Sequence, residues 1–221
     1  MTAVQPDISV IDRRRSLEVR WILPGAPQAA VAARFARFEA AVESREDVYL
    51  LDPRLPGMAV KLRNGRAFEV KVYQGSPGIL EVARCARGRL ESWDKWSFPG
   101  ELLSQDGAAR PGRRPVRKLI RKFTLASGQS VARVPGLGEE AACEVELTEV
   151  HVGGQAWWTL AFEATGPARL LRAELETTAA LVFAQALPDG VELGTDDSRS
   201  YAQWLTGGDA RTMSTAAGGT E

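Results

Sequence analysis

The sequence predicts an α+β fold, mainly antiparallel β, in which seven or eight strands form a closed barrel or a sandwich with a few helices packed outside. Three observations predict it. Many short segments alternate apolar and polar residues with the period typical of strands, and turn signals separate them. Two longer segments repeat apolar residues at helical spacing instead. The polar positions of the strands are rich in Lys, Arg and Glu, so many strands have one apolar and one charged face.

The composition fits one sizeable domain of 221 residues whose charges balance. Lys and Arg together number 28, as do Asp and Glu, so no overall basic field indicates a specific nucleic-acid partner or an anionic membrane. Cys85 and Cys143 are too few for a disulfide framework, which favours a reducing compartment, although one bridge between them stays open. No segment has the apolar length of a membrane span or the pattern of a signal peptide, so we expect a cytoplasmic protein.

We expect a single folded domain over residues 15–206, as a monomer or a homodimer. Residues 1–14 and 207–221 are small, polar and aperiodic, which indicates flexible tails at both ends of the chain. The secondary-structure elements described next therefore belong to one fold.

The folded part begins with a strand and a helix. Alternation over 16–23 predicts a strand that ends at the turn signal Pro24-Gly25. Apolar residues at helical spacing over 27–43 predict an amphipathic helix on the outside of the sheet. A short strand over 47–51 follows.

A hairpin over 59–73 is predicted by strict alternation on both sides of Asn64-Gly65, a favoured two-residue turn. The positions between its apolar residues hold Lys, Arg and Glu. The central part of the chain adds three strands at 79–84, 90–98 and 116–125 and a Pro- and Gly-rich loop at 99–115.

The last third of the chain contains a second hairpin and two helices. Residues 142–152 and 156–164 alternate on either side of Gly153-Gly154, which predicts another two-residue turn. An apolar stripe over 167–186 predicts a helix, and 198–205 predicts a last turn or two of helix.

The charged faces of these strands decide the functional hypothesis. For any single strand they are consistent with a solvated face. The apolar stripes of the helices, however, must cover the apolar sheet faces. If the helices lie outside, the charged faces line the lumen of a closed barrel, where charges are costly unless they meet a ligand.

Such a lumen fits a polyanion, because Lys and Arg hold phosphate oxygens by charge-assisted hydrogen bonds. Carboxylates in the same lumen would repel the anion unless they held a divalent cation against it, as Mg²⁺ or Mn²⁺ does with oxygen ligands. Both signs of charge therefore predict metal-dependent phosphoryl chemistry on a small polyanionic ligand.

The order of the charged motifs resembles that of the CYTH superfamily, the triphosphate tunnel metalloenzymes. That family has an opening Glu-x-Glu-x-Lys strand, an Arg-x-Arg strand, a partner strand ending in Lys, late acidic strands and a closing Ser-Tyr-x-x-x-Leu. The matching positions here span roughly 16 to 205: Ser16-Leu17-Glu18-Val19-Arg20, Lys61-Leu62-Arg63, Glu69-Val70-Lys71, Glu144-Val145-Glu146, Phe162-Glu163 and Ser200-Tyr201 to Leu205.

The resemblance implies an eight-stranded antiparallel tunnel that acts on triphosphate or polyphosphate compounds with Mg²⁺ or Mn²⁺. It implies metal binding by Glu18, Glu144, Glu146 and Glu163, with Glu18 and Glu146 as catalytic residues. It also implies that the phosphates are held by Arg20, Lys61, Arg63 and Lys71.

Charge adds Lys95, Lys118 and Arg121 to the phosphate-binding candidates. The phase of the strand that holds the last two is ambiguous, so either of its faces can point inward, and a solvated edge strand is an alternative. Trp93 and Trp96 flank Lys95 and are interpreted as packing residues. His151 is the only histidine and is expected at the surface, which excludes a site built from several histidines.

The chain also departs from the family motifs. Ser16 replaces the first acid, Arg20 replaces the Lys, and Ala161 stands where a late Glu-x-Glu would begin. Fewer carboxylates weaken metal binding, so a module that binds a phosphorylated ligand without turnover is the alternative to a hydrolase, and a class IV adenylyl cyclase is the third hypothesis. Glu69 is either a replacement metal ligand or an ion-pair partner of the lysines.

Overall fold

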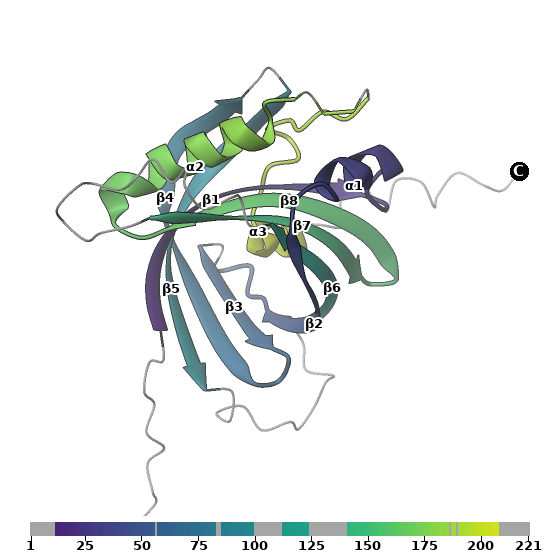
Figure 1. Ribbon diagram of the computed structural model, residues 1–221. Coiled ribbons are helices and arrows are strands. Elements are labelled where there is room, and N and C mark those ends of the chain that lie inside the picture. Colours follow the sequence, from purple (N-terminus) through teal and green to yellow (C-terminus); the bar gives the residue numbers. More distant parts are fainter. Residues whose placement is uncertain are drawn as a thin grey trace, which may run out of the picture.

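The computed structural model describes residues 12–55, 57–82, 85–99, 112–123, 141–185, 187–188 and 190–207. Within them, eight antiparallel strands close into a barrel in the order β1-β5-β4-β3-β2-β6-β7-β8 (Figure 1), which confirms the predicted α+β barrel. The strands are β1 (Asp12–Pro24), β2 (Ala40–Leu50), β3 (Met58–Arg63), β4 (Ala67–Val82), β5 (Ala86–Pro99), β6 (Arg113–Phe123), β7 (Ala142–Val152) and β8 (Gln155–Thr165). The helices are α1 (Ala29–Phe35), α2 (Ala168–Val182) and α3 (Tyr201–Gly207).

Both hairpins predicted from the sequence are confirmed. β3 and β4 pair across three residues, Asn64 to Arg66, because Arg63 is opposite Ala67, so the first turn is one residue longer than expected. β7 and β8 pair across the expected two residues, Gly153-Gly154, which both have positive φ. Most of the predicted tails and of the loop at 99–115 lie outside the described residues. The described parts correct two bounds, since residues 12–14 pair with β5 as the start of β1 and residues 113–115 pair with β2 as the start of β6. Cys85 and Cys143 are both free, and no helix in the described ranges is long and apolar enough to cross a membrane.

The helix predicted over 27–43 is wrong beyond Phe35. α1 ends there, and the chain from Ala40 onward is β2, which pairs with β6 along its whole length. Val31 and Phe35 are buried as the helical period requires, but Val42 is 64% exposed and pairs with Arg121 in the sheet. The pairing of β2 with β6 therefore outweighs the helical period in this segment.

The strand predicted at 79–84 is confirmed as far as Val82, where the described residues stop, but it is not separate from the preceding hairpin. β4 continues to Val82 and pairs with β5 on both sides of an irregularity. The register shifts between Tyr73 and Gly78. Gly75 and Gly78 have φ of 119° and 123°, a conformation that favours glycine. The strand is bent rather than ended by the glycines and the proline between them.

The main hydrophobic core lies outside the barrel, between the sheet and the helices. Leu17, Val19 and Trp21 point outward from β1 into this core, and α2 crosses over the same region (Figure 1). The indole of Trp21 packs over Gly88, where an added Cβ would lie 2.5 Å from Val19 Cγ2. Because the apolar faces of the strands pack against the helices outside the barrel, the alternate residues of each strand point into the lumen.

A second apolar cluster closes one end of the barrel. Trp204 and Leu205 of α3 pack there with residues from the strand ends, among them Ile22 and Val116. The Trp157 ring lies 5.1 Å from the Trp204 ring and belongs to this closure. The lumen is therefore covered by α3 at this end.

Candidate functional site

The lumen contains a cavity of about 330 Å³, within the size range of small-molecule sites. Its described lining includes nine cationic and six acidic side chains, so positive charge is in excess. The cations are Arg14, Arg20, Arg45, Lys61, Arg63, Lys71, Lys95, Lys118 and Lys122, and the acids are Asp12, Glu18, Glu69, Glu144, Glu146 and Glu163.

Nearly all candidate site residues from the sequence line this cavity, with Arg121 as the exception. On β6, Lys118 and Lys122 point inward, whereas Arg121 forms an ion pair of 2.8 Å with Glu149 and is absent from the lining. Phe123 shares the phase of Arg121 and packs on Phe35 of the outer core, which fixes the strand's orientation. The structure thus resolves the ambiguity of β6 and places Arg121 outside the lumen.

The acidic residues form a row across adjacent strands. Glu144 of β7 is opposite Glu163 of β8, Glu163 is opposite Glu18 of β1, and Glu18 is opposite Glu91 of β5. Like charges directly across a sheet destabilise it unless cations lie between them. The cations that meet this requirement are Lys71 of β4, Lys122 of β6 and Arg20, which lies on β1 beside Glu18 itself.

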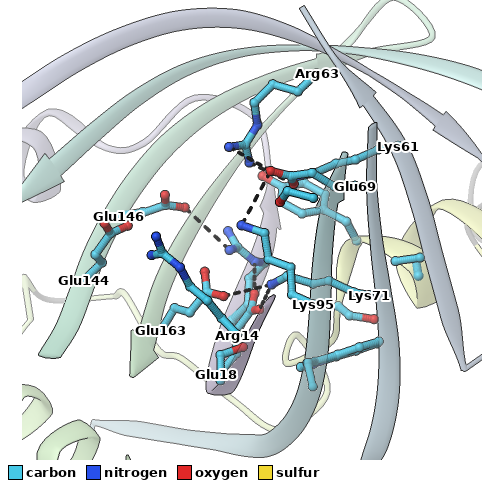
Figure 2. A pocket seen from close by; sticks show the side chains of 18 of the residues that line it. Arg14, Glu18, Lys61, Arg63, Glu69, Lys71, Lys95, Glu144, Glu146 and Glu163 are labelled. Carbon is cyan, nitrogen blue, oxygen red and sulfur yellow. Dashed lines mark hydrogen bonds and ion pairs between the residues drawn. The ribbon is translucent and has the colours of Figure 1, made fainter. Parts of the chain in front are cut away.

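Lys71 is the central cation of the acidic row (Figure 2). Its Nζ donates to Glu18 Oε2 at 2.9 Å and to Glu163 Oε1 at 3.0 Å. Arg20 Nε donates to the other oxygen of Glu18 at 2.9 Å, and its guanidinium lies 3.6 Å from Glu146. These contacts turn the row of acids into a compact ion-pair network.

The network keeps its members charged. Burial raises the pKa of Glu18 and of Glu163, but the positive charge of Lys71 outweighs it and holds both pKa values below the usual range. Burial alone lowers the pKa of Lys71, and the two carboxylates more than offset this, so its pKa is raised. The ammonium and both carboxylates are therefore ionised at neutral pH.

The contacts of Glu69 in the structure are ion pairs. Its carboxylate lies 3.0 Å from Lys61 Nζ, 3.0 Å from Arg63 Nη1 and 3.5 Å from Lys95 Nζ. These cations outweigh the effect of burial and lower the pKa of Glu69 to about 2. In the structure Glu69 is therefore the shared ion-pair partner of Lys61, Arg63 and Lys95.

Asp47, which the sequence analysis did not select, is a second centre of charge. It is completely buried, and its nearest cations are Lys118 at 2.8 Å, Arg45 at 3.4 Å, Lys61 at 3.7 Å and Arg63 at 3.9 Å. Burial raises its pKa, but the charges of Lys61, Lys118 and Arg45 lower it overall. Its position opposite Arg63 is set by the pairing of β2 with β3, which the sequence does not reveal.

Lys118 lies at the closed end of the lumen. Its Nζ donates to Asp47 and, at 2.9 Å, to the Tyr49 hydroxyl, and it lies 3.9 Å from the centre of the Tyr201 ring. Burial lowers the pKa of Lys118 to about 7, even though Asp47 opposes the shift. Lys118 is more tightly enclosed than the other lysines and has less charge to offer at neutral pH.

Glu91 is another residue that the sequence analysis missed. It is only 3% exposed, and its Oε1 has no hydrogen-bond partner in the described part of the chain. Burial, followed by the charge of Glu18, raises the pKa of Glu91 to about 7. Glu91 has the same inward phase as Trp93 and Lys95, so the alternation along β5 could have identified it as a lumen residue.

The metal site implied by the family resemblance does not fit this arrangement. Glu18 and Glu163 share the ammonium of Lys71, and Glu144 is paired with Lys122 at 2.9 Å near the cavity mouth. Among the residues that the structure describes, no three His, Cys, Asp or Glu side chains are grouped to hold a metal ion. The positions between the acids are taken by the chain's own cations.

Comparison with protein-family models gives no match, and comparison with curated proteins gives none. Among solved structures, the chain is similar to the PH1819 protein from Pyrococcus horikoshii OT3, with 14% identity, a TM-score of 0.43, and coverage of 86% of this chain and 98% of that one. It is also similar to the S. pombe Pct1 RNA triphosphatase in complex with the Spt5 CTD, with 10% identity, a TM-score of 0.39, and coverage of 80% and 84%. Likenesses at this level leave the function to be argued from the lumen itself.

Proposed function

We propose that the protein binds a triphosphate, or the end of a short polyphosphate chain, in the lumen of its barrel. The observation that carries the proposal is the excess of cations around a cavity of about 330 Å³ that α3 covers at one end. Buried cations are costly unless a counter-charge reaches them. A chain of phosphates supplies several negative charges in a narrow volume and accepts hydrogen bonds from Lys and Arg.

The cations available to such a ligand are those with the weakest internal partners. Lys95 has an ion pair of 3.5 Å with Glu69, and Lys61 and Arg63 share that same carboxylate. The only other acid that forms an ion pair with these three cations in the described part of the chain is Asp47, which lies 3.7 Å from Lys61 and 3.9 Å from Arg63. Two carboxylates therefore serve the three cations, and Lys95 is the least neutralised. This local surplus supports binding of a polyanion between β3, β4 and β5.

Metal-dependent hydrolysis of triphosphate or polyphosphate, the activity expected from the sequence, is the second candidate. It is favoured by the carboxylates of Glu18, Glu146 and Glu163, which remain ionised in the same cavity as the cationic wall. The engagement of Glu18 and Glu163 by Lys71 favours binding over this activity.

Two measurements on the full chain test the proposal. Thermal unfolding is followed with orthophosphate, pyrophosphate, triphosphate and, as a polyanion of different geometry, citrate. We expect the largest increase in Tm with triphosphate, because its charge engages the most cations. Release of orthophosphate from triphosphate is measured with Mg²⁺ and with Mn²⁺. Stabilisation without release supports a binding protein, and steady release supports the hydrolase. If triphosphate neither is hydrolysed nor raises the Tm, both candidate functions are contradicted.

Lys95→Met is expected to weaken triphosphate binding about tenfold, the effect of removing one charge-assisted hydrogen bond. The matched control is Arg121→Met, since Arg121 was predicted to bind phosphate but lies outside the lumen. This control should leave the affinity unchanged. Isothermal titration calorimetry of both variants checks the expectation, and equal losses in the two variants would show that binding occurs elsewhere.

A further inference from the structure

We propose that the ammonium of Lys71 takes the place of a divalent cation in this lumen, so that the protein binds its polyanionic ligand without a metal ion. The inference rests on the proposed function for the identity of the ligand. Its structural basis is independent of that ligand, because it concerns the contacts that Lys71 makes with Glu18 and Glu163.

The position of the ammonium between two carboxylates is the first argument. Lys71 Nζ lies 2.9 Å from Glu18 Oε2 and 3.0 Å from Glu163 Oε1, and Figure 2 shows the three side chains meeting from β4, β1 and β8. These two residues are cross-strand neighbours, so their carboxylates would repel each other without a cation between them. Lys71 supplies that positive charge from the opposite wall.

The number of hydrogen-bond donors on the ammonium is the second argument. An ammonium group has three N–H donors, and among the described residues two of them go to Glu18 and Glu163. Lys71 lines the cavity, with 17% of its side chain exposed, so the third donor is available to an oxygen of a ligand. Lys71 can therefore link two carboxylates to a phosphate, which is the bridging role that a divalent ion has between acids and phosphates.

The surrounding charges favour the lysine over a divalent ion. Arg20 already binds the second oxygen of Glu18, and Lys95 also acts on Glu163 through its charge. A doubly charged ion added here would face several cations with few free carboxylate oxygens. Removing the ammonium of Lys71 would reverse this preference, because two ionised carboxylates would then lack their shared partner.

The first experiment uses Mn²⁺ alone as the probe, with the EPR signal of free Mn²⁺ as the readout. Wild-type protein is expected to leave the signal unchanged. Lys71→Met is expected to bind one Mn²⁺ per chain and to gain thermal stability from it. Lys95→Met, a lysine of the same lumen that does not bridge the acids, is the control and should gain no site. The double variant Lys71→Met with Glu18→Gln should lose the gained site.

Wild-type binding of Mn²⁺ that Glu163→Gln abolishes would overturn the proposal, as would a folded Lys71→Met variant that binds no Mn²⁺. If Lys71→Met does not fold, wild-type protein decides through calorimetry with triphosphate in EDTA and in Mg²⁺. Equal affinities support the proposal, and binding only with Mg²⁺ overturns it. Absence of triphosphate binding under all conditions would contradict the proposed function alone, since the wild-type Mn²⁺ result stands without it.

Discussion

Replacement of Asp47 by asparagine is expected to lower the free energy of unfolding by about 3–5 kcal/mol, the loss found when one partner of a buried ion pair is removed. Asp47 is completely buried, and Lys118, Arg45 and Lys61 lie within 3.7 Å of its carboxylate. Without its negative charge these cations repel one another in a region that water does not reach. Asparagine keeps the shape of the side chain, so the loss reports the charge.

The same variant is expected to gain more stability from triphosphate than the wild type does. The cations that Asp47 neutralises become available to the ligand, so triphosphate should restore part of the lost Tm. Urea unfolding with and without triphosphate measures both effects. The control is Asp94→Asn, whose ion pair with Arg15 is at the surface and should contribute about 0–1 kcal/mol. If Asp47→Asn is destabilised and triphosphate does not raise its Tm, the cations around Asp47 do not take part in ligand binding.

Replacement of Glu91 by glutamine is expected to stabilise the protein at pH 8 but not at pH 4.5. The pKa of Glu91 is raised from 4.5 to about 7 in the folded state. The folded state therefore holds the proton more tightly than the unfolded state, and the stability it contributes is lost as pH rises from about 4.5 through 7. A shift of this size corresponds to roughly 3 kcal/mol, and glutamine never ionises.

The difference in unfolding free energy between Glu91→Gln and wild type, measured from pH 4.5 to 8, tests this expectation. It should rise from about pH 4.5 to about 7 in favour of the variant and then level off. Glu81→Gln is the control, because Glu81 is exposed and its ion pair with Arg87 is at the surface. A flat difference across this range would mean that Glu91 titrates normally and that its burial carries no cost.

The fold was predictable where alternation and turn chemistry agree. Both hairpins have strict alternation around Asn64-Gly65 or Gly153-Gly154, so their strands and inward residues were predicted correctly. The segment after Phe35 was not, because Phe38 and Val42 continue a helical period while sheet pairing with β6 decides the structure. Periodicity describes one segment, whereas pairing depends on a partner far away in the chain.

The site was predictable in its composition but not in its connections. Alternation placed Glu18, Lys61 and Lys71 in the lumen, and the structure brings them together. Asp47 was missed because its importance comes from neighbours on other strands, at a register that the sequence does not reveal. Glu91 shares the inward phase of Lys95, but its pairing with Glu18 depends on that same kind of register. The bridge from Lys71 to Glu18 and Glu163 depends on the closure of the barrel, since the three residues come from three different strands.

Calorimetric titration of the full chain with inorganic triphosphate in EDTA, at low and at high salt, tests the central claim most directly. The charged lumen predicts one triphosphate per chain, an affinity that falls as salt screens the cations, and loss of binding in a Lys61→Met, Lys95→Met double variant. Absence of binding at low salt, or binding that the double variant retains in full, would contradict the claim that the lumen is a polyphosphate site.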